Sequence, residues 1–173
     1  MNDKIKSVIV LTVICLVVTA LLAVTNSITS PIIAEARAEK VQKSLSTVLP
    51  DSSQFCEVEL PENAPASVKA AYKAADGSYA VVLATKSAYS SGDMGITVGF
   101  SPEGEIKGIT LTSYQESKDF GKDTYPQNYV GRNGADYEKV DSFAGVTYSS
   151  KALKAAIGDA FDLIEMLKGG EGK

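Results

Sequence analysis

An uncharged segment near the N-terminus most constrains what this chain can fold into. Residues 7–33 contain no charged residue, and residues 8–24 are almost wholly apolar. A helix needs about 20 apolar residues to cross the hydrocarbon core of a bilayer, so this segment is long enough to span a membrane. We predict a transmembrane helix over residues 7–30, preceded by a short N-terminal segment, residues 1–6.

A cleaved signal peptide is the alternative interpretation of this segment, because Lys4 and Lys6 precede the apolar run as they would in a signal sequence. The run is long for a signal peptide, and no clear small-residue cleavage site closes it. An uncleaved anchor is therefore favoured.

The charges beside the apolar run predict its orientation. Lys4 and Lys6 lie directly before it, whereas Glu35 comes before Arg37 on its far side. By the positive-inside rule, residues 1–6 are expected in the cytoplasm. The rest of the chain then faces the extracytoplasmic side of a single-pass protein of the cell (inner) membrane.

The composition excludes several classes of function. Without Asp3, Lys4 and Lys6 the chain has 15 basic and 20 acidic residues, a formal net charge of −5, which disfavours nucleic acid as a partner. It has no histidine and only two cysteines, Cys15 in the apolar run and Cys56 outside it. These counts exclude Ser-His-Asp catalysis, histidine-ligated haem, most zinc sites and a disulfide within the outer domain. No catalytic or metal-binding residue is predicted, so any chemistry must rest on carboxylates, hydroxyls, lysines or an organic cofactor.

The remaining pattern predicts an α+β domain. Residues 34–49 are rich in helix formers, so we expect the membrane helix to continue as a helical stalk over residues 31–50, until Pro50 ends it. Residues 51–173 are assigned to one extracytoplasmic domain.

Strand-like segments fill the first half of that domain. A short strand is expected within 54–60, a pair at 67–77 and 78–90 joined by an Asp-Gly turn, and a hairpin of 95–100 with 105–114. Residues 115–140 are polar and predict loops with at most a short helix. Residues 151–168 predict an amphipathic helix with one apolar face, ended by two glycines. An antiparallel sheet with a packed C-terminal helix is therefore expected.

The segment DSFAGVTYSS, residues 141–150, precedes this helix. Gly145 favours a sharp turn, and Ser149 or Ser150 is expected at the N-cap. Because the first turn of a helix presents unpaired N–H groups and partial positive charge, a phosphate could bind there with Thr147 beside it. On these residues alone, a capped helix start without a ligand is the favoured interpretation.

The order of residues in this segment resembles the flavinylation motif of the FMN-binding domain family. In that family a flavin transferase joins FMN through its phosphate to a threonine hydroxyl, so the resemblance implies covalent FMN on Thr147. The motif's Asp, Ser or Ala, Gly, Ala or Val, Thr and Ser correspond to Asp141, Ala144, Gly145, Val146, Thr147 and Ser149. Apart from Ala144, we carry all of these as candidate cofactor-binding residues.

A second segment, residues 91–117, resembles the glycine-rich entry, the hairpin and the following glutamate of the same family. It adds Met94 and Glu116 as candidate flavin-site residues. The segment after the strand, ESKDFGKD, keeps Glu116 and Gly121 but lacks the family's proline. Aromatic candidates to line the flavin ring are Tyr89, Tyr114, Phe120, Phe143 and Tyr148.

One anchor followed by a single small FMN domain resembles the G-subunit family of Rnf-type complexes. Those complexes are membrane ferredoxin:NAD⁺ oxidoreductases coupled to Na⁺ or H⁺ translocation, so the resemblance implies an electron-carrier subunit rather than a stand-alone enzyme. The implied partners are other membrane subunits, a flavin transferase and membrane lipid. The C-subunit family of Na⁺-translocating NADH:quinone oxidoreductases is the alternative, and a non-redox binding or structural domain is an alternative of another class.

Overall fold

In the computed structural model, the chain is described over residues 3–86, 92–114 and 123–170. It divides into two units, residues 1–40 and 41–173, and each is described by itself. The first unit is helical throughout its described part, and the second contains the sheet and the C-terminal helix.

Helix α1 (Asp3–Val48) is continuous and contains Pro31. Its most apolar 18-residue stretch has a mean hydropathy of 3.0 and none of it is buried, so α1 is long and apolar enough to cross a membrane. Threonine and serine hydroxyls in this stretch donate to carbonyls four residues earlier, as Thr12 does to Val8 and Thr19 to Cys15. Such internal bonds satisfy polar groups where no water is available. The expected extension of the helix beyond the apolar run is confirmed, and it ends two residues before Pro50.

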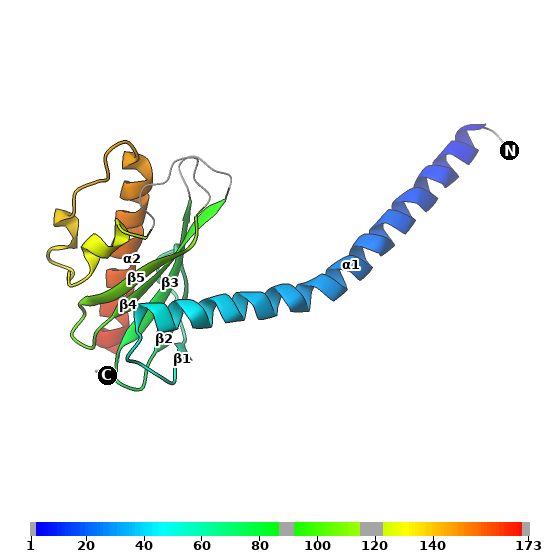
Figure 1. The fold of residues 1–173 in the computed structure, drawn as a ribbon. Helices are drawn as coiled ribbons and strands as arrows, with labels where there is room; N and C mark the ends of the chain where they lie inside the picture. Colours follow the sequence, from blue (N-terminus) through cyan, green and yellow to red (C-terminus); the bar gives the residue numbers. More distant parts are fainter. Residues whose placement is uncertain (1–2, 87–91, 115–122, 171–173) are drawn as a thin grey trace. The chain divides into compact units, whose positions relative to one another are not determined.

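The second unit contains a five-stranded antiparallel sheet in which neighbouring strands follow the chain order (Figure 1). The predicted turns at residues 76–77 and 101–104 are confirmed, with positive φ at Gly77 and Gly104, the conformation for which glycine is suited. The strands are β1 (Cys56–Val58), β2 (Val68–Lys73), β3 (Tyr79–Lys86), β4 (Asp93–Phe100) and β5 (Ile106–Ser113).

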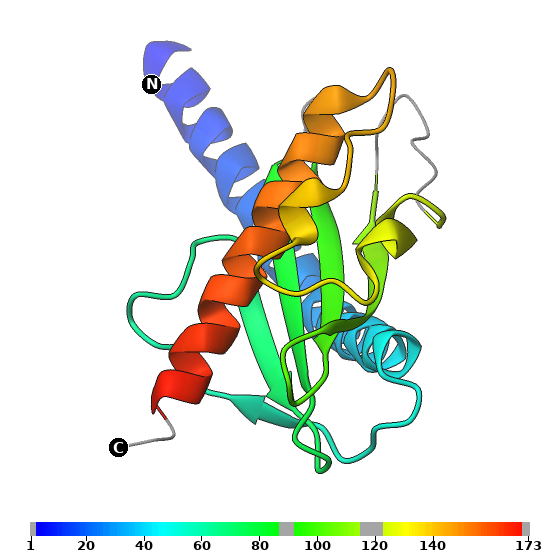
Figure 2. The same cartoon turned by 90° about the vertical axis from the view of Figure 1, so that its left-hand side faces the viewer.

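Helices cover both faces of this sheet. Helix α2 (Thr147–Gly170) lies across one face, and the last turns of α1 lie on the other (Figure 2). On the α2 side, Ile96 and Phe100 of β4 join one core with Leu153 and Ile157 of α2. On the opposite side, Leu45, Val48 and Leu49 form a second core with Ala80. The expected α+β class, with an antiparallel sheet and a packed C-terminal helix, is confirmed.

The end of α1 approaches the sheet closely because two paired glycines provide space. Gly99 of β4 is the register partner of Gly108 of β5. A Cβ atom at Gly108 would lie 2.5 Å from the Val48 carbonyl oxygen, and one at Gly99 would lie 2.9 Å from the same atom. Nearby, the buried Thr97 hydroxyl donates to the Ser44 hydroxyl at 3.1 Å. Residues 41–49 are therefore an integral layer of the domain.

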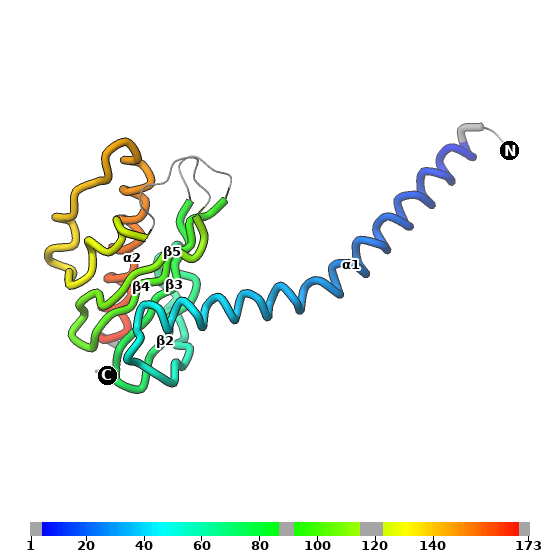
Figure 3. Tube along the Cα trace, viewed as in Figure 1, coloured from blue at the N-terminus to red at the C-terminus, as the bar shows by residue number. Residues whose placement is uncertain are grey.

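The described residues 123–146 connect the edge of the sheet to α2 (Figure 3). They contain two short 3₁₀ helices, η1 (Pro126–Tyr129) and η2 (Tyr137–Lys139), whereas at most one short helix was predicted among these loops. The Gly131 N–H donates to the Ile106 carbonyl, and the Ile106 N–H donates to the Arg132 carbonyl, both at 2.8 Å. Gln127 adds a side-chain bond to the Ile109 carbonyl. This segment therefore covers the outer edge of β5.

Candidate functional site

A tight turn leads into α2. The Val146 N–H donates to the Phe143 carbonyl at 3.2 Å, and Gly145 has a φ of +84° at the third position of this turn. That pattern corresponds to a type II turn, which needs positive φ at this position. No atom lies within 4 Å of where a Gly145 Cβ would be, so the backbone angle and not crowding requires glycine.

Helix α2 begins at Thr147, four residues before the predicted start. The Val146 carbonyl accepts the first helical bond, from the Ser150 N–H at 3.1 Å, so Val146 occupies the N-cap position. The prediction that Ser149 or Ser150 caps the helix is therefore wrong. The reason is tertiary: Val146 is buried in the main core. In addition, the Ser150 hydroxyl donates to the Val146 carbonyl at 3.0 Å and accepts from the Phe143 N–H at 3.1 Å.

Thr147 is the first residue of α2, and its side chain is exposed. Its hydroxyl makes no hydrogen bond to any residue that the structure describes. The first N–H groups of a helix have no carbonyl of a preceding turn to bind, and they give this end a partial positive charge. The first turn carries no acidic residue that would offset this charge. The arrangement suits a bound phosphate group.

Ser149 lies two residues further along the same turn and is fully buried. Its hydroxyl oxygen is, within the described part of the chain, the buried side-chain polar atom that has no hydrogen-bond partner. Buried polar groups in folded proteins are nearly always hydrogen-bonded, so an unpaired hydroxyl at this position is unusual and requires an explanation.

Aromatic side chains contact the turn and lie near Thr147 in the sequence. The Tyr125 hydroxyl donates to the Asp141 carbonyl at 2.9 Å, and the Tyr125 ring meets the Phe143 ring edge-on at 5.7 Å. Phe143 is 38% exposed and Tyr148 is 67% exposed. Outside α1, the exposed large hydrophobic side chains among the described residues are Val130, Phe143 and Tyr148. Two exposed rings therefore lie within four residues of Thr147.

The other predicted site residues that the structure describes differ in burial. Asp141 is exposed, and its carboxylate makes no hydrogen bond to a described residue. Met94 is buried in the main core near the start of β4, and Tyr114 is half-buried against that core. Glu116, Tyr89 and Phe120 lie outside the described residues.

The turn lies at one end of the sheet. At the other end, Lys168 in the last turn of α2 donates from Nζ to the Pro102 carbonyl at 2.6 Å, in the turn between β4 and β5. The first turn of α2 therefore lies towards the end where β3 and β5 finish and β4 begins (Figures 1 and 2). Met94, the second residue of β4, belongs to this same end.

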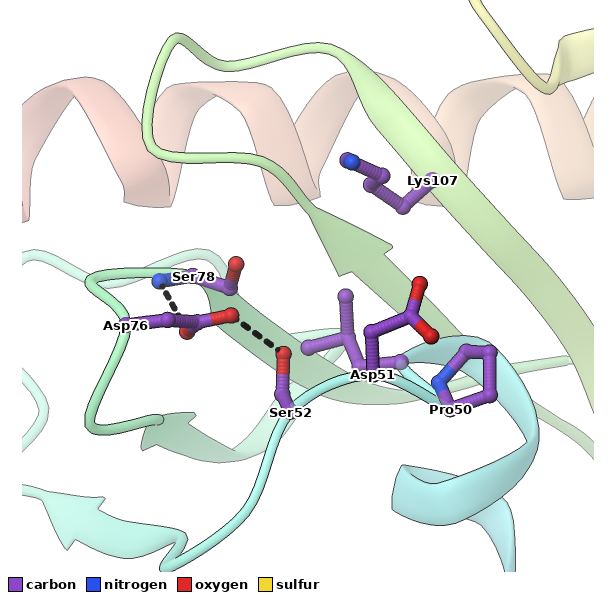
Figure 4. Close-up of a pocket in the computed structure, with 7 residues that line it drawn as sticks. Pro50, Asp51, Ser52, Asp76, Ser78 and Lys107 are labelled. Atoms are coloured by element: carbon purple, nitrogen blue, oxygen red, sulfur yellow. Dashed lines mark hydrogen bonds between the residues drawn. The ribbon is translucent and has the colours of Figure 1, made fainter.

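Two hollows in the described surface include no residue of the motif. A cavity of about 120 Å³ lies beside the end of α1 (Figure 4), lined by Leu49, Pro50, Asp51, Ser52, Asp76, Ser78 and Lys107. Within it, Asp76 accepts bonds from the Ser52 hydroxyl at 2.7 Å and the Ser78 N–H at 3.0 Å, and both lower the pKa of Asp76. An open groove of about 440 Å³ runs between residues 58–62 and Met166 and Leu167.

Among the described residues, no cluster of three metal-ligating side chains is found. The candidate site is thus an open surface at the start of α2.

Comparisons with known families give two matches. Residues 90–162 match the model of the FMN-binding domain, and residues 1–48 match the RnfG N-terminal region. Together the two matches make the chain similar to an FMN-binding, RnfG-like protein. The first match runs from just before β4 into α2 and includes the whole turn with Thr147, whereas the second ends at the last residue of α1. No curated protein matches the chain.

The residues of the FMN-binding domain fit the group that the family match implies. An exposed hydroxyl stands at the positive end of a helix, a buried hydroxyl beside it lacks a partner, and two exposed rings flank the turn. Sequence reasoning missed Tyr125 and the two-sided role of Ser150. Nothing in the spacing of Tyr125 signals its bond to a carbonyl 16 residues later, whereas Ser150 gave a signal that was interpreted as a cap.

Proposed function

We propose that this RnfG-like flavoprotein is a membrane-anchored electron-transfer subunit that carries FMN as a phosphoester on Thr147. The observation that carries the proposal is the position of Thr147. It is the exposed first residue of α2, within the segment that matches the FMN-binding domain. Its hydroxyl is thus accessible to a transferase and adjoins the positive end of the helix.

The linkage requires an activated flavin, since condensing free FMN with a hydroxyl would release water into an aqueous medium. A flavin dinucleotide is suited as donor because it contains a phosphoanhydride. The Thr147 Oγ–H bond and the P–O bond of the anhydride break, the Oγ–P bond forms, and a nucleoside monophosphate leaves with the proton. The flavin transferase supplies the catalytic groups, and this chain supplies the hydroxyl. The product keeps one negative charge, which the first turn of α2 stabilises.

The bound flavin supplies one- and two-electron transfer, chemistry for which this chain has no histidine or metal cluster among its own described residues. The protein's part is to hold and orient the ring. Phe143 and Tyr148 are the exposed rings nearest in sequence to Thr147, and we assign them to the flavin ring as stacking partners. Covalent attachment prevents loss of the cofactor by diffusion on the extracytoplasmic side.

The match of residues 1–48 supports assigning the chain to an Rnf-type complex rather than to the related NADH:quinone oxidoreductase. In this proposal the chain passes electrons within a ferredoxin:NAD oxidoreductase coupled to Na⁺ or H⁺ translocation. Its partners are the other membrane subunits, with α1 in the lipid and the FMN-binding domain outside.

The proposal is tested by replacing Thr147. The full chain is co-expressed with a flavin transferase, and flavin fluorescence is recorded in a denaturing gel. We expect Thr147→Ala to abolish the fluorescent band, while Ser142→Ala, an exposed hydroxyl in the same segment, leaves it unchanged. A fluorescent band in the Thr147→Ala variant would contradict the assignment.

A further inference from the structure

We propose that the buried hydroxyl of Ser149 donates a hydrogen bond to the phosphate of the flavin attached at Thr147. The inference rests on the proposed function and assigns a phosphate-binding role to one further side chain. It starts from the unpartnered Ser149 oxygen in the first turn of α2.

The hydrogen bonds around the turn show why Ser149 differs from its neighbour. Ser150 is also fully buried, but its hydroxyl is satisfied twice, by the Val146 carbonyl and the Phe143 N–H. The Phe143 carbonyl is used by the Val146 N–H. A helical serine commonly donates to the carbonyl four residues earlier, and Ser150 does so whereas Ser149 does not. The turn is thus organised by Ser150, and Ser149 contributes no bond to it.

An unpartnered buried hydroxyl is a cost to the folded protein unless a ligand satisfies it. A phosphodiester offers anionic oxygens, and a bond from a hydroxyl to such an oxygen is shorter and stronger than one between neutral groups. The same turn supplies helix N–H groups and bears no acidic side chain. A single anionic phosphate at the start of α2 would satisfy these donors together.

This role differs from a structural one in the sign of its effect on stability. A hydroxyl that braces the fold stabilises the protein with or without flavin. A buried hydroxyl whose only hydrogen-bond partner is the phosphate destabilises the flavin-free protein and stabilises the flavin-loaded form. Ser149→Ala therefore separates the two roles.

The experiment measures Tm for the full chain in detergent, prepared without and with a co-expressed flavin transferase. Covalent loading is verified by intact mass in every sample. We expect Ser149→Ala to raise the Tm of the flavin-free chain by about 2–4 °C and to reduce the Tm gain on loading by at least that amount. Ser142→Ala, which removes an exposed hydroxyl of the same segment, should change neither quantity. The ³¹P resonance of the attached phosphate should shift in Ser149→Ala and not in Ser142→Ala.

Two results would overturn the assignment. One is an equal fall in Tm for both forms of Ser149→Ala, which would make the hydroxyl structural. The other is an unchanged Tm gain together with an unchanged ³¹P resonance. Failure of the proposed function is recognised separately, because the wild-type chain would then show no flavin mass after co-expression, and both proposals would fall.

Discussion

The backbone conformation at position 145 requires glycine. Its φ of +84° lies in the left-handed region, which costs residues with a Cβ roughly 1–2 kcal/mol. No atom lies near its Cβ position, so a methyl group adds strain but no clash. The turn that delivers Thr147 to the helix start therefore depends on this one residue type.

We expect Gly145→Ala to lower the free energy of unfolding by about 1 kcal/mol, because alanine must adopt a positive φ there. Urea unfolding of the flavin-free chain in detergent measures it, with tyrosine fluorescence as the probe since the chain has no tryptophan. Gly169→Ala is the matched control: it also has open space around the Cβ position but no positive φ, so it should not destabilise. Equal effects of the two substitutions would contradict the turn geometry.

The buried phenol of Tyr129 is expected to make the folded protein less stable at alkaline pH. It is fully buried and lies 3.4 Å from the Tyr125 hydroxyl, and burial first and this hydrogen bond second raise its pKa above the usual value near 10. Below pH 10 the phenol is neutral in both the folded and unfolded states, so its contribution is fully present. As pH rises above 10 the unfolded state loses its proton first, and stability falls.

In Tyr129→Phe we expect the unfolding free energy to fall less steeply with pH between pH 10 and 11.5. The slope should decrease by up to the equivalent of about one bound proton. Tyr72 and Tyr137 also have raised pKa values, mainly from burial, and account for part of the remaining decline. Urea unfolding of the flavin-free chain at a series of pH values measures the slopes. Identical slopes for wild type and variant would show that Tyr129 ionises freely in the folded state.

The sequence located the motif but not the contacts that organise it. The order of residues around Thr147 is local information, so the resemblance could assign the attachment residue. The bonds of Ser150 and the burial of Ser149 depend on how the turn packs on the core, which no spacing reveals. Met94 was predicted from its place in the hairpin, and the structure buries it in the core at the same end of the sheet as the turn.

At the scale of elements, the strands and hairpins were predictable because turn residues and apolar runs are local signals. The start of α2 was not, because the burial of Val146 outweighs the preference of serine for the N-cap. The second helical layer was expected only as a helical stalk. The reason for its close approach, the Gly99 and Gly108 pair, becomes visible only with the register of β4 and β5.

The glycine pair gives a prediction for the contact between α1 and the sheet. A methyl group in Gly108→Ala would lie 2.5 Å from the Val48 carbonyl oxygen, a backbone atom that cannot rotate away. We expect a loss of about 1–3 kcal/mol in the free energy of unfolding. Gly134→Ala, whose added carbon would meet the Phe161 ring at an ordinary 3.7 Å, should have little effect in the same urea experiment. An unchanged free energy of unfolding in Gly108→Ala would show that α1 does not pack against Gly108 in solution.

At the scale of the whole molecule, the two cysteines report the proposed orientation. Cys56 is exposed on β1 of the sheet, and Cys15 lies in the apolar part of α1. A membrane-impermeant maleimide added to spheroplasts should label Cys56 without permeabilisation, because we place the domain outside the cell membrane. Cys56→Ser should abolish the label, since a polar reagent does not reach Cys15 within lipid. Labelling that requires permeabilised cells would reverse the orientation.

We have proposed that the protein carries its flavin on one hydroxyl at the start of α2. The most direct test of this proposal is tandem mass spectrometry of peptides from the full chain co-expressed with a flavin transferase. We expect the added mass of an FMN phosphoester on fragments that contain Thr147, and on none that end before it. Flavin mass on Ser142, Ser149 or Ser150, or flavin that dissociates wholly on denaturation, would contradict it.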